Sequence, residues 1–334
     1  MRRWLPLLAL TLAASAAEPV TLRLGFFPNL THAPALAARQ LEREGVDWLA
    51  GHVPSGTKVE WLAYNAGPSA VEALFAGSID ASFVGPSPLL SGYVRSQGRG
   101  LRLILPIAYG GNALVARSGF TGKGPADFRG ARVGTPQLGN TQDVDARVWL
   151  MSGGLKVTLR GGDAHVLPMA NPELLQLFAR GELDAVWTVE PWVTRLTSEF
   201  GGRIVYRKDD ALITVLAASA RSLERSAKKE AILGVAHAIL ALRDRLEADP
   251  ALRLKLVRVG LGAELKSTPP NETLVRESLD HLHLAQPSHD AQARRAALAN
   301  LLGQSLRDSQ SAGILRDTYP VDPLLEDLVD DPAR

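Results

Sequence analysis

The chain has 334 residues, 46% of them hydrophobic and 22% charged, which is the composition of a globular protein long enough for two domains. Its formal net charge is +2, and would be 0 without Arg2 and Arg3, so we expect no basic surface that binds nucleic acid. The absence of cysteine excludes disulfides, thiol catalysis and lipid attachment at an N-terminal cysteine.

The first residues, MRRWLPLLALTLAASAAEP, have the pattern of a secretory signal peptide. A basic start precedes an apolar core from Trp4 to Leu12, and small residues then offer a cleavage site near Ala17. We therefore expect residues 1–17 to be removed and the mature protein to be periplasmic. No later stretch is long and apolar enough for a membrane span, so no membrane insertion is expected.

The mature chain begins with alternating strands and helices. Residues 20–26 favour a strand, and a helix is expected over 33–43, with Thr31 as its cap and Pro34 in its first turn. A strand over 58–64, a helix over 67–77 and a buried strand within 78–86 follow. This βαβαβ order is typical of a parallel sheet covered by helices.

Two long apolar runs are expected to connect two lobes. One covers residues 101–117 and is interrupted by Gly110 and Gly111, and the other covers 210–222. Lobe 1 would contain residues 18–108 and 213–334, lobe 2 residues 109–212, and the two crossings would form a hinge. Later helical segments are expected to pack on lobe 1, with a loop over 261–274 and a frayed acidic end from residue 324.

A similar segment recurs in each lobe. LFAGSIDASFVGP, residues 74–86, can be aligned with LFARGELDAVWTVEP, residues 177–191, and Asp80 and Asp184 then occupy equivalent positions. The spacing of about a hundred residues is too long for a solenoid, so we interpret it as two similar α/β lobes.

Four loops follow predicted strands, where ligands of open parallel sheets bind. FFPNLTHA, VGPSP, GTPQLGNTQ and VEPWV offer hydroxyls, amides and aromatic rings, and none contains lysine or arginine. GTPQLGNT resembles a phosphate-binding loop, but Asn140 stands where that loop has lysine, so triphosphate chemistry is not expected. The loop can instead present N–H groups and hydroxyls to a small anion. Three or four charge-assisted hydrogen bonds could reach micromolar affinity.

Several side chains admit more than one interpretation. Trp187 is expected in the core, whereas Glu190 could be a solvated turn residue or receive a cationic ligand group. The histidines of HLHLAQPSH, residues 281–289, have no established metal-site spacing and are expected at the surface. No catalytic triad or carboxylate pair can be assembled, so we expect no catalytic residue, metal or cofactor.

The sequence resembles the periplasmic substrate-binding proteins of ABC transporters, in the branch for nitrate, aliphatic sulfonates, taurine and thiamine precursors. The matching segments are LRLGFFPNLTHAPALAA, GSIDASFVGPSP, DFRGARVGTPQLGNTQDVDAR and GELDAVWTVEPW. The resemblance implies a bilobed α/β fold of the second periplasmic-binding-protein type, with two parallel-type sheets, flanking helices and a two-strand hinge. The ligand-binding residues it implies, together with Phe27 as an apolar contact, are Asn29, His32, Ser87, Asn112, Thr135, Asn140, Thr141, Gln142, Glu190 and Trp192.

The resemblance also implies a partner and a ligand class. The protein would be a monomer that binds one small anion and delivers it to ABC permease subunits. Because His32 is the only candidate cation in the loops, an aliphatic sulfonate such as taurine is the expected ligand, held by neutral donors against Phe27 or Trp192. Nitrate, a phosphonate and a pyrimidine precursor of thiamine remain open. So do a cofactor-biosynthesis enzyme of the same fold and a sensor that docks to a membrane receptor.

Overall fold

The computed structural model describes residues 20–284 and 290–329. The signal peptide predicted for residues 1–17 lies outside them, as do His289 and the last five residues. Within the described residues, no helix is long and apolar enough to cross a membrane.

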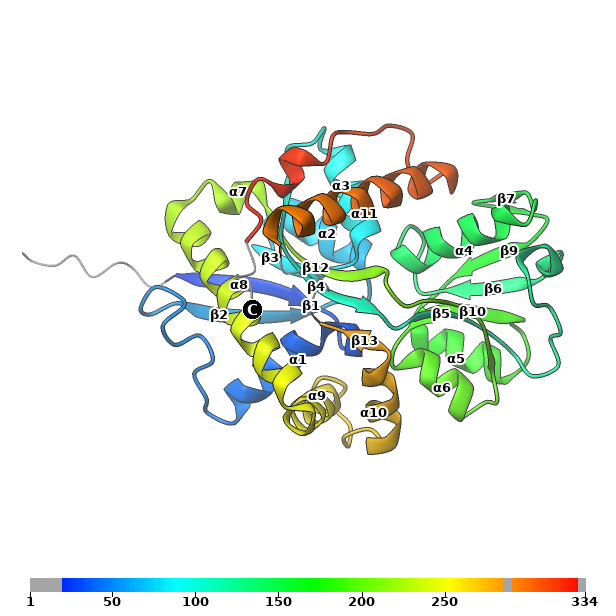
Figure 1. The fold of residues 1–334 in the computed structure, drawn as a ribbon, viewed down its shortest axis with the longest axis horizontal. Helices are drawn as coiled ribbons and strands as arrows, with labels where there is room; N and C mark the ends of the chain where they lie inside the picture. Colours follow the sequence, from blue (N-terminus) through cyan, green and yellow to red (C-terminus); the bar gives the residue numbers. More distant parts are fainter. Residues whose placement is uncertain (1–19, 285–289, 330–334) are drawn as a thin grey trace, which may run out of the picture.

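The described chain forms two large mixed sheets that lie side by side, each covered by helices (Figure 1). The first has the strand order β13-β4-β12-β3-β1-β2, and the second has the order β11-β5-β10-β6-β9. The first sheet contains β1 (Thr21–Phe26), β2 (Lys58–Ala63), β3 (Ala81–Val84), β4 (Leu101–Gly110), β12 (Leu212–Ser219) and β13 (Leu282–His283). The second contains β5 (Asn112–Ala116), β6 (Arg132–Thr135), β9 (His165–Pro168), β10 (Ala185–Val189) and β11 (Arg203–Lys208).

The two sheets share one topology. Each has a parallel core, β2-β1-β3 in the first and β9-β6-β10 in the second, and an antiparallel strand, β12 or β5, beside the last core strand. The α/β fold class is therefore confirmed, with antiparallel strands at the crossings between the sheets. The two short strands β7 (Val157–Thr158) and β8 (Gly161–Gly162) form a separate hairpin.

Helices on both faces of each sheet bury its apolar side chains. On the first sheet, α1 (Ala33–Arg43), α8 (Ser226–Ala248) and α9 (Pro250–Glu264) share one core cluster, and α2 (Gly67–Ala76), α3 (Pro86–Arg95) and α11 (Ala291–Ser311) share another. On the second, α4 (Thr141–Ser152) covers one face, and α5 (Asn171–Ala179) and α6 (Trp192–Ser198) cover the other. Trp187 is buried in this second core, as predicted.

We call the parts built on the first and second sheets lobe 1 and lobe 2. The chain passes from one to the other between β4 and β5 and again between β11 and β12. Gly110 and Gly111 form the first crossing with φ angles of 76° and 63°, a left-handed conformation that favours glycine. That the lobes move as separate units, divided at 108/109 and 212/213, remains a prediction.

The predicted repeat is present in three dimensions. Asp80, just before β3, accepts a hydrogen bond from the backbone N–H of Arg23 in β1 at 2.9 Å. Asp184, just before β10, accepts the equivalent bond from Arg132 in β6, also at 2.9 Å. Each aspartate thus ties two neighbouring parallel strands together, β3 to β1 in the first sheet and β10 to β6 in the second.

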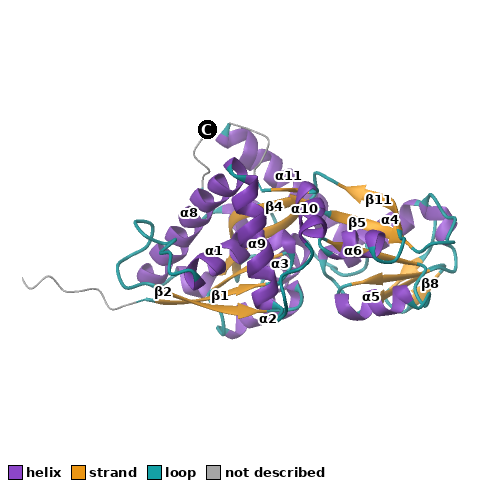
Figure 2. Ribbon diagram, turned by 90° about the horizontal axis from the view of Figure 1, so that it is seen from below, coloured by secondary structure: helices purple, strands orange, loops and turns teal. Residues whose placement is uncertain are grey.

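The C-terminal region differs from the prediction. The loop predicted over 261–274 is present but shorter, over residues 265–271, because α9 extends to Glu264 and α10 (Glu272–Asp280) already begins at Glu272. Leu324 and Leu325 are buried, and Val329 donates its N–H to the Ile104 carbonyl, so residues 324–329 are packed rather than frayed. The later helices do not pack on lobe 1 alone, since α10 contacts α6 and α11 contacts α4 (Figure 2).

Candidate ligand-binding site

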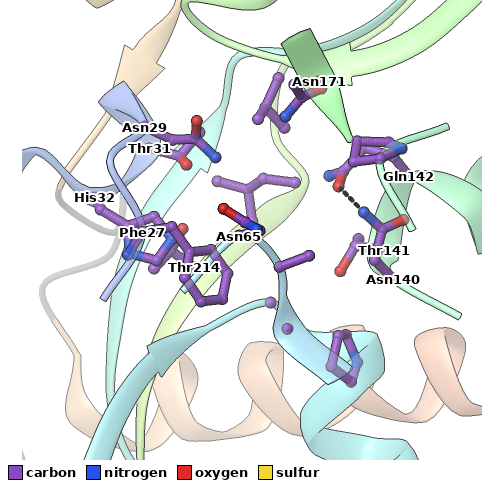
Figure 3. Close-up of a pocket in the computed structure, with 17 residues that line it drawn as sticks. Phe27, Asn29, Thr31, His32, Asn65, Asn140, Thr141, Gln142, Asn171 and Thr214 are labelled. Carbon is purple, nitrogen blue, oxygen red and sulfur yellow. Dashed lines mark hydrogen bonds between the residues drawn. The ribbon is translucent and has the colours of Figure 1, made fainter. Parts of the chain in front are cut away.

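A small cavity lies between the lobes, beyond the carboxyl ends of their parallel strands (Figure 3). Its volume is about 40 Å³, space for about three water molecules. None of its 17 lining residues is Asp, Glu, Lys or Arg. They are Phe27, Asn29, Thr31, His32, Asn65, Ala66, Gly67, Gly85, Pro88, Pro136, Asn140, Thr141, Gln142, Asn171, Val189, Ile213 and Thr214.

Six of the predicted site residues line this cavity, and they come from both lobes. Phe27, Asn29 and His32 lie in the turn after β1. Asn140, Thr141 and Gln142 lie at the start of α4 on the opposite side (Figure 3). The structure therefore brings the first and third predicted loops together around one space.

The α4 loop is built around the carboxylate of Asp143. This carboxylate accepts hydrogen bonds from Thr135 Oγ1 at 3.0 Å and the Gly139 N–H at 3.0 Å, and it pairs with the buried guanidinium of Arg147 at 3.0 Å. Asn140 caps the helix, because its Oδ1 accepts from the Asp143 N–H at 2.8 Å. The charge that shapes the loop is thus neutralised inside it, and uncharged groups face the cavity.

His32 is a neutral side chain in this environment. It is 2% exposed, and burial lowers the pKa of its imidazole from 6.5 to about 3. Its Nδ1 accepts a hydrogen bond from the Phe27 N–H at 3.2 Å, so the ring proton is on Nε2. His32 was the only candidate cation in the four loops, and the structure makes it an uncharged donor instead.

Three predicted residues make contacts between the lobes and do not line the cavity. Trp192 Nε1 donates to Asn29 Oδ1 at 3.0 Å, and the Ser87 N–H lies 3.5 Å from Thr141 Oγ1. Glu190 is fully buried, and its carbonyl accepts from the Leu30 N–H at 3.3 Å.

The interpretation of Glu190 as a solvated turn residue is therefore wrong, because the residue is fully buried. A contact of its carboxylate with a cationic ligand group remains a prediction, and in this structure the carboxylate has protein partners. It accepts from the Thr194 N–H at 3.0 Å and lies 2.8 Å from His281 Nδ1. His281 follows α10 on lobe 1, so this pair also joins the lobes. The prediction of a surface histidine missed this partner, because nothing in the local sequence relates positions 190 and 281.

Two other predicted residues are structural within lobe 2. Asn112 is fully buried, accepts from Trp187 Nε1 at 2.8 Å and donates to Asp145 Oδ2 at 2.7 Å. Thr135 holds Asp143, as described above. Neither residue lines the cavity, because stronger partners inside the lobe occupy their polar atoms.

Four polar residues that line the cavity were not among the predicted ligand-binding residues. Asn65 follows β2 and Asn171 follows β9, so the rule that ligands bind at strand ends would have found both had it been applied to every parallel strand. Thr214 lies within β12, and its buried hydroxyl has no partner among the described residues. Thr31 was predicted as a helix cap, but the cap position of α1 is His32, and Thr31 faces the cavity (Figure 3).

These features define a bilobed binding protein with an uncharged cavity between its lobes. The chain matches the NMT1-like family over residues 15–260 and belongs to that family. The resemblance inferred from sequence is therefore confirmed at the level of family and fold.

Among curated proteins, a putative binding protein of Brucella abortus is 26% identical over 203 residues, which are 59% of this chain and 57% of that protein. The match thus spans little more than half of the relative. The taurine-binding periplasmic protein of Escherichia coli is 27% identical over 147 residues, 43% of each chain.

Solved structures show the same fold. The alkanesulfonate-binding protein SsuA from Xanthomonas axonopodis pv. citri, solved with MOPS bound, superposes with a TM-score of 0.69 at 23% identity, over 93% of this chain and 99% of that one. The nitrate-binding protein NrtA from Synechocystis gives 0.69 at 14% identity, over 92% and 84%. These relatives and neighbours are all named as binding proteins.

Proposed function

We propose that this protein is the periplasmic solute-binding component of an ABC importer, and that it captures a small oxyanion between its lobes and delivers it to membrane permease subunits. The ligand we propose is an aliphatic sulfonate such as taurine. The protein would act as a monomer, without a cofactor and without catalysing a reaction.

The observation that carries this proposal is the uncharged cavity where strand-end loops of both lobes meet. Hydroxyl, amide and imidazole N–H groups can surround an anion there, and in a site closed to water each charge-assisted bond contributes about 1.5–3 kcal/mol. Phe27, which is buried and lines the cavity, offers an apolar surface to an alkyl group. The names of the relatives, which include taurine-, alkanesulfonate- and nitrate-binding proteins, support the same ligand class.

We further propose that ligand binding accompanies closure of the lobes about the two crossings. The contacts of Trp192 with Asn29 and of Glu190 with Leu30 and His281 would form on closing. X-ray scattering should then show a smaller radius of gyration with ligand than without it.

A thermal-shift panel of taurine, ethanesulfonate, nitrate, ethylphosphonate and a hydroxymethylpyrimidine tests the ligand. A sulfonate at about 100 times its Kd should stabilise the protein by about 2.7 kcal/mol. Stabilisation by the pyrimidine alone would overturn the proposed ligand, and chemical turnover of any compound would favour the enzyme alternative.

A further inference from the structure

Building on this proposed function, we propose that the cavity favours oxyanions that carry no proton, because most of its amide and imidazole side chains are held with their N–H groups available to a ligand. Their acceptor atoms already accept hydrogen bonds within the protein, at Asn29, His32, Asn140, Gln142 and Asn171. Such a lining accepts a sulfonate or nitrate, whose oxygens only accept hydrogen bonds. It disfavours a phosphonate or phosphate that retains a P–OH group near neutral pH.

On the lobe 1 side, the acceptor atoms of Asn29 and His32 already accept hydrogen bonds from groups that can only donate. Asn29 Oδ1 accepts from the indole Nε1–H of Trp192 at 3.0 Å. His32 Nδ1 accepts from the backbone N–H of Phe27 at 3.2 Å. Because an indole N–H and a backbone N–H have no acceptor role, these bonds also fix which way the Asn29 amide and the His32 ring face.

On the lobe 2 side the acceptors are also occupied, and two of the bonds form a chain from Asp143 through Asn140 to Gln142. Asn140 Oδ1 accepts from the Asp143 N–H at 2.8 Å, which leaves its Nδ2 to donate to Gln142 Oε1 at 3.2 Å. Asn171 Oδ1 is occupied by the Thr188 hydroxyl at 2.7 Å. The acceptor atoms of all three amides are therefore used, and the backbone bond to Asn140 sets the orientation of Gln142.

The opposite ends of these groups remain for a ligand. No protein partner among the described residues is recorded for Asn29 Nδ2, Gln142 Nε2 or Asn171 Nδ2, and the nitrogens of Asn29 and Asn171 lie toward the cavity in Figure 3. The Thr214 hydroxyl has no partner among the described residues, and no such bond holds the Thr31 hydroxyl or the Asn65 amide. These three groups can each donate to an anion or accept a hydrogen bond from it.

The chemistry of the anion decides the outcome. The P–OH group of an alkylphosphonate monoanion would face donors except at Thr31, Asn65 and Thr214. Where it does not reach one of these three, an unsatisfied buried hydroxyl costs about tenfold to a hundredfold in affinity. Its dianion would bring a second negative charge to a cavity that no cation lines. Behind the wall, Asp143 pairs with Arg147, and the Glu190 carboxylate lies 2.8 Å from His281 Nδ1.

Calorimetric titration of the full mature chain with ethanesulfonate and ethylphosphonate at about pH 6 tests this inference. We expect ethanesulfonate to bind about 10–100 times more tightly. Equal affinities would overturn the inference and leave the proposed function standing. Binding of neither sulfonate nor nitrate would instead remove the proposed function, and the inference with it.

Two substitutions test whether the bonds that hold Asn29 and Asn171 cause this preference. Trp192→Phe removes the donor that orients Asn29, and Thr188→Val removes the donor to Asn171, so each should lower the ratio of ethanesulfonate to ethylphosphonate affinity several-fold. A purely structural role would weaken both ligands equally and leave the ratio unchanged, which would contradict the inference. Trp149→Phe is the matched control, because Trp149 packs on Phe128 and Trp187 away from the cavity, and its ratio should equal that of the wild type.

Discussion

The Nδ1 atom of His281 lies 2.8 Å from Oε1 of the fully buried Glu190, and this pair joins the C-terminal part of lobe 1 to lobe 2. Because Glu190 is fully buried, water cannot readily replace His281 as the partner of this carboxylate oxygen.

His281→Ala should therefore lower the free energy of unfolding by about 1–3 kcal/mol, because a buried acceptor loses its donor. It should also speed ligand release, since the contact crosses the cleft. Chemical denaturation and stopped-flow dissociation measure the two effects. His283→Ala is the control, because His283 is exposed two residues away; equal behaviour of the two variants would contradict a role for the pair.

The buried pair inside the α4 loop gives a second prediction. Arg147→Met should destabilise the protein by about 3–5 kcal/mol, because it leaves the Asp143 carboxylate without its buried counter-charge. Arg129→Met removes an exposed pair with Asp163 and should cost less than about 1 kcal/mol. Urea unfolding of both variants compares them, and similar losses would mean that the α4 loop does not depend on this pair.

His32 predicts a pH dependence of stability. Burial lowers its pKa from 6.5 to about 3, so the unfolded chain binds a proton that the folded chain excludes between these values. Stability from this residue is complete above pH 6.5 and is lost as the pH falls, by up to about 1.4 kcal/mol per unit.

In His32→Gln, the loss of stability between about pH 7 and pH 5 should be smaller by about 2 kcal/mol. Denaturant titrations at both pH values measure it. The exposed His52 provides the control, since His52→Gln should leave the wild-type pH dependence intact. An unchanged dependence in His32→Gln would show that folding does not lower the pKa of His32.

Thr141 gives a prediction for binding itself. Its hydroxyl lines the cavity and lies 3.5 Å from the Ser87 N–H of the other lobe. Thr141→Val should weaken sulfonate binding by about 1–3 kcal/mol, measured by calorimetry. Thr268→Val, in an exposed loop, should have no effect. Wild-type affinity in Thr141→Val would mean that the α4 loop shapes the fold without holding the ligand.

Local signals in the sequence predicted most of the fold. The strand over 20–26, the helix over 33–43 and the long run broken at Gly110 all appear close to their expected bounds, because alternation, proline and glycine act on neighbouring residues. The repeat that aligned Asp80 with Asp184 also corresponds to equivalent bonds in the two sheets. The C-terminal segments were predicted less well, because their packing depends on distant partners.

The candidate site was predicted at the level of loops better than at the level of atoms. Strand-end position located Asn29, Asn140 and Gln142 around the cavity, since topology alone brings such loops together. The same reasoning could not show that the side chain of Asn112 bonds to Trp187 and Asp145, or that the carboxylate of Glu190 bonds to His281. Those partners are 33 to 91 positions away in the chain, and hydrogen-bond competition at that range has no local signature.

The short strand β13 ties the C-terminal part of the chain to the first crossing between the lobes. Leu282 pairs with Gly110, and a Cβ on Gly111 would lie 2.4 Å from the Leu282 side chain. The C-terminal segment therefore packs tightly against the first crossing. Any hinge motion at Gly110 and Gly111 would therefore have to carry Leu282 and His281 with it. We expect substitutions in this segment to change how long a ligand stays bound without changing which ligand the cavity prefers.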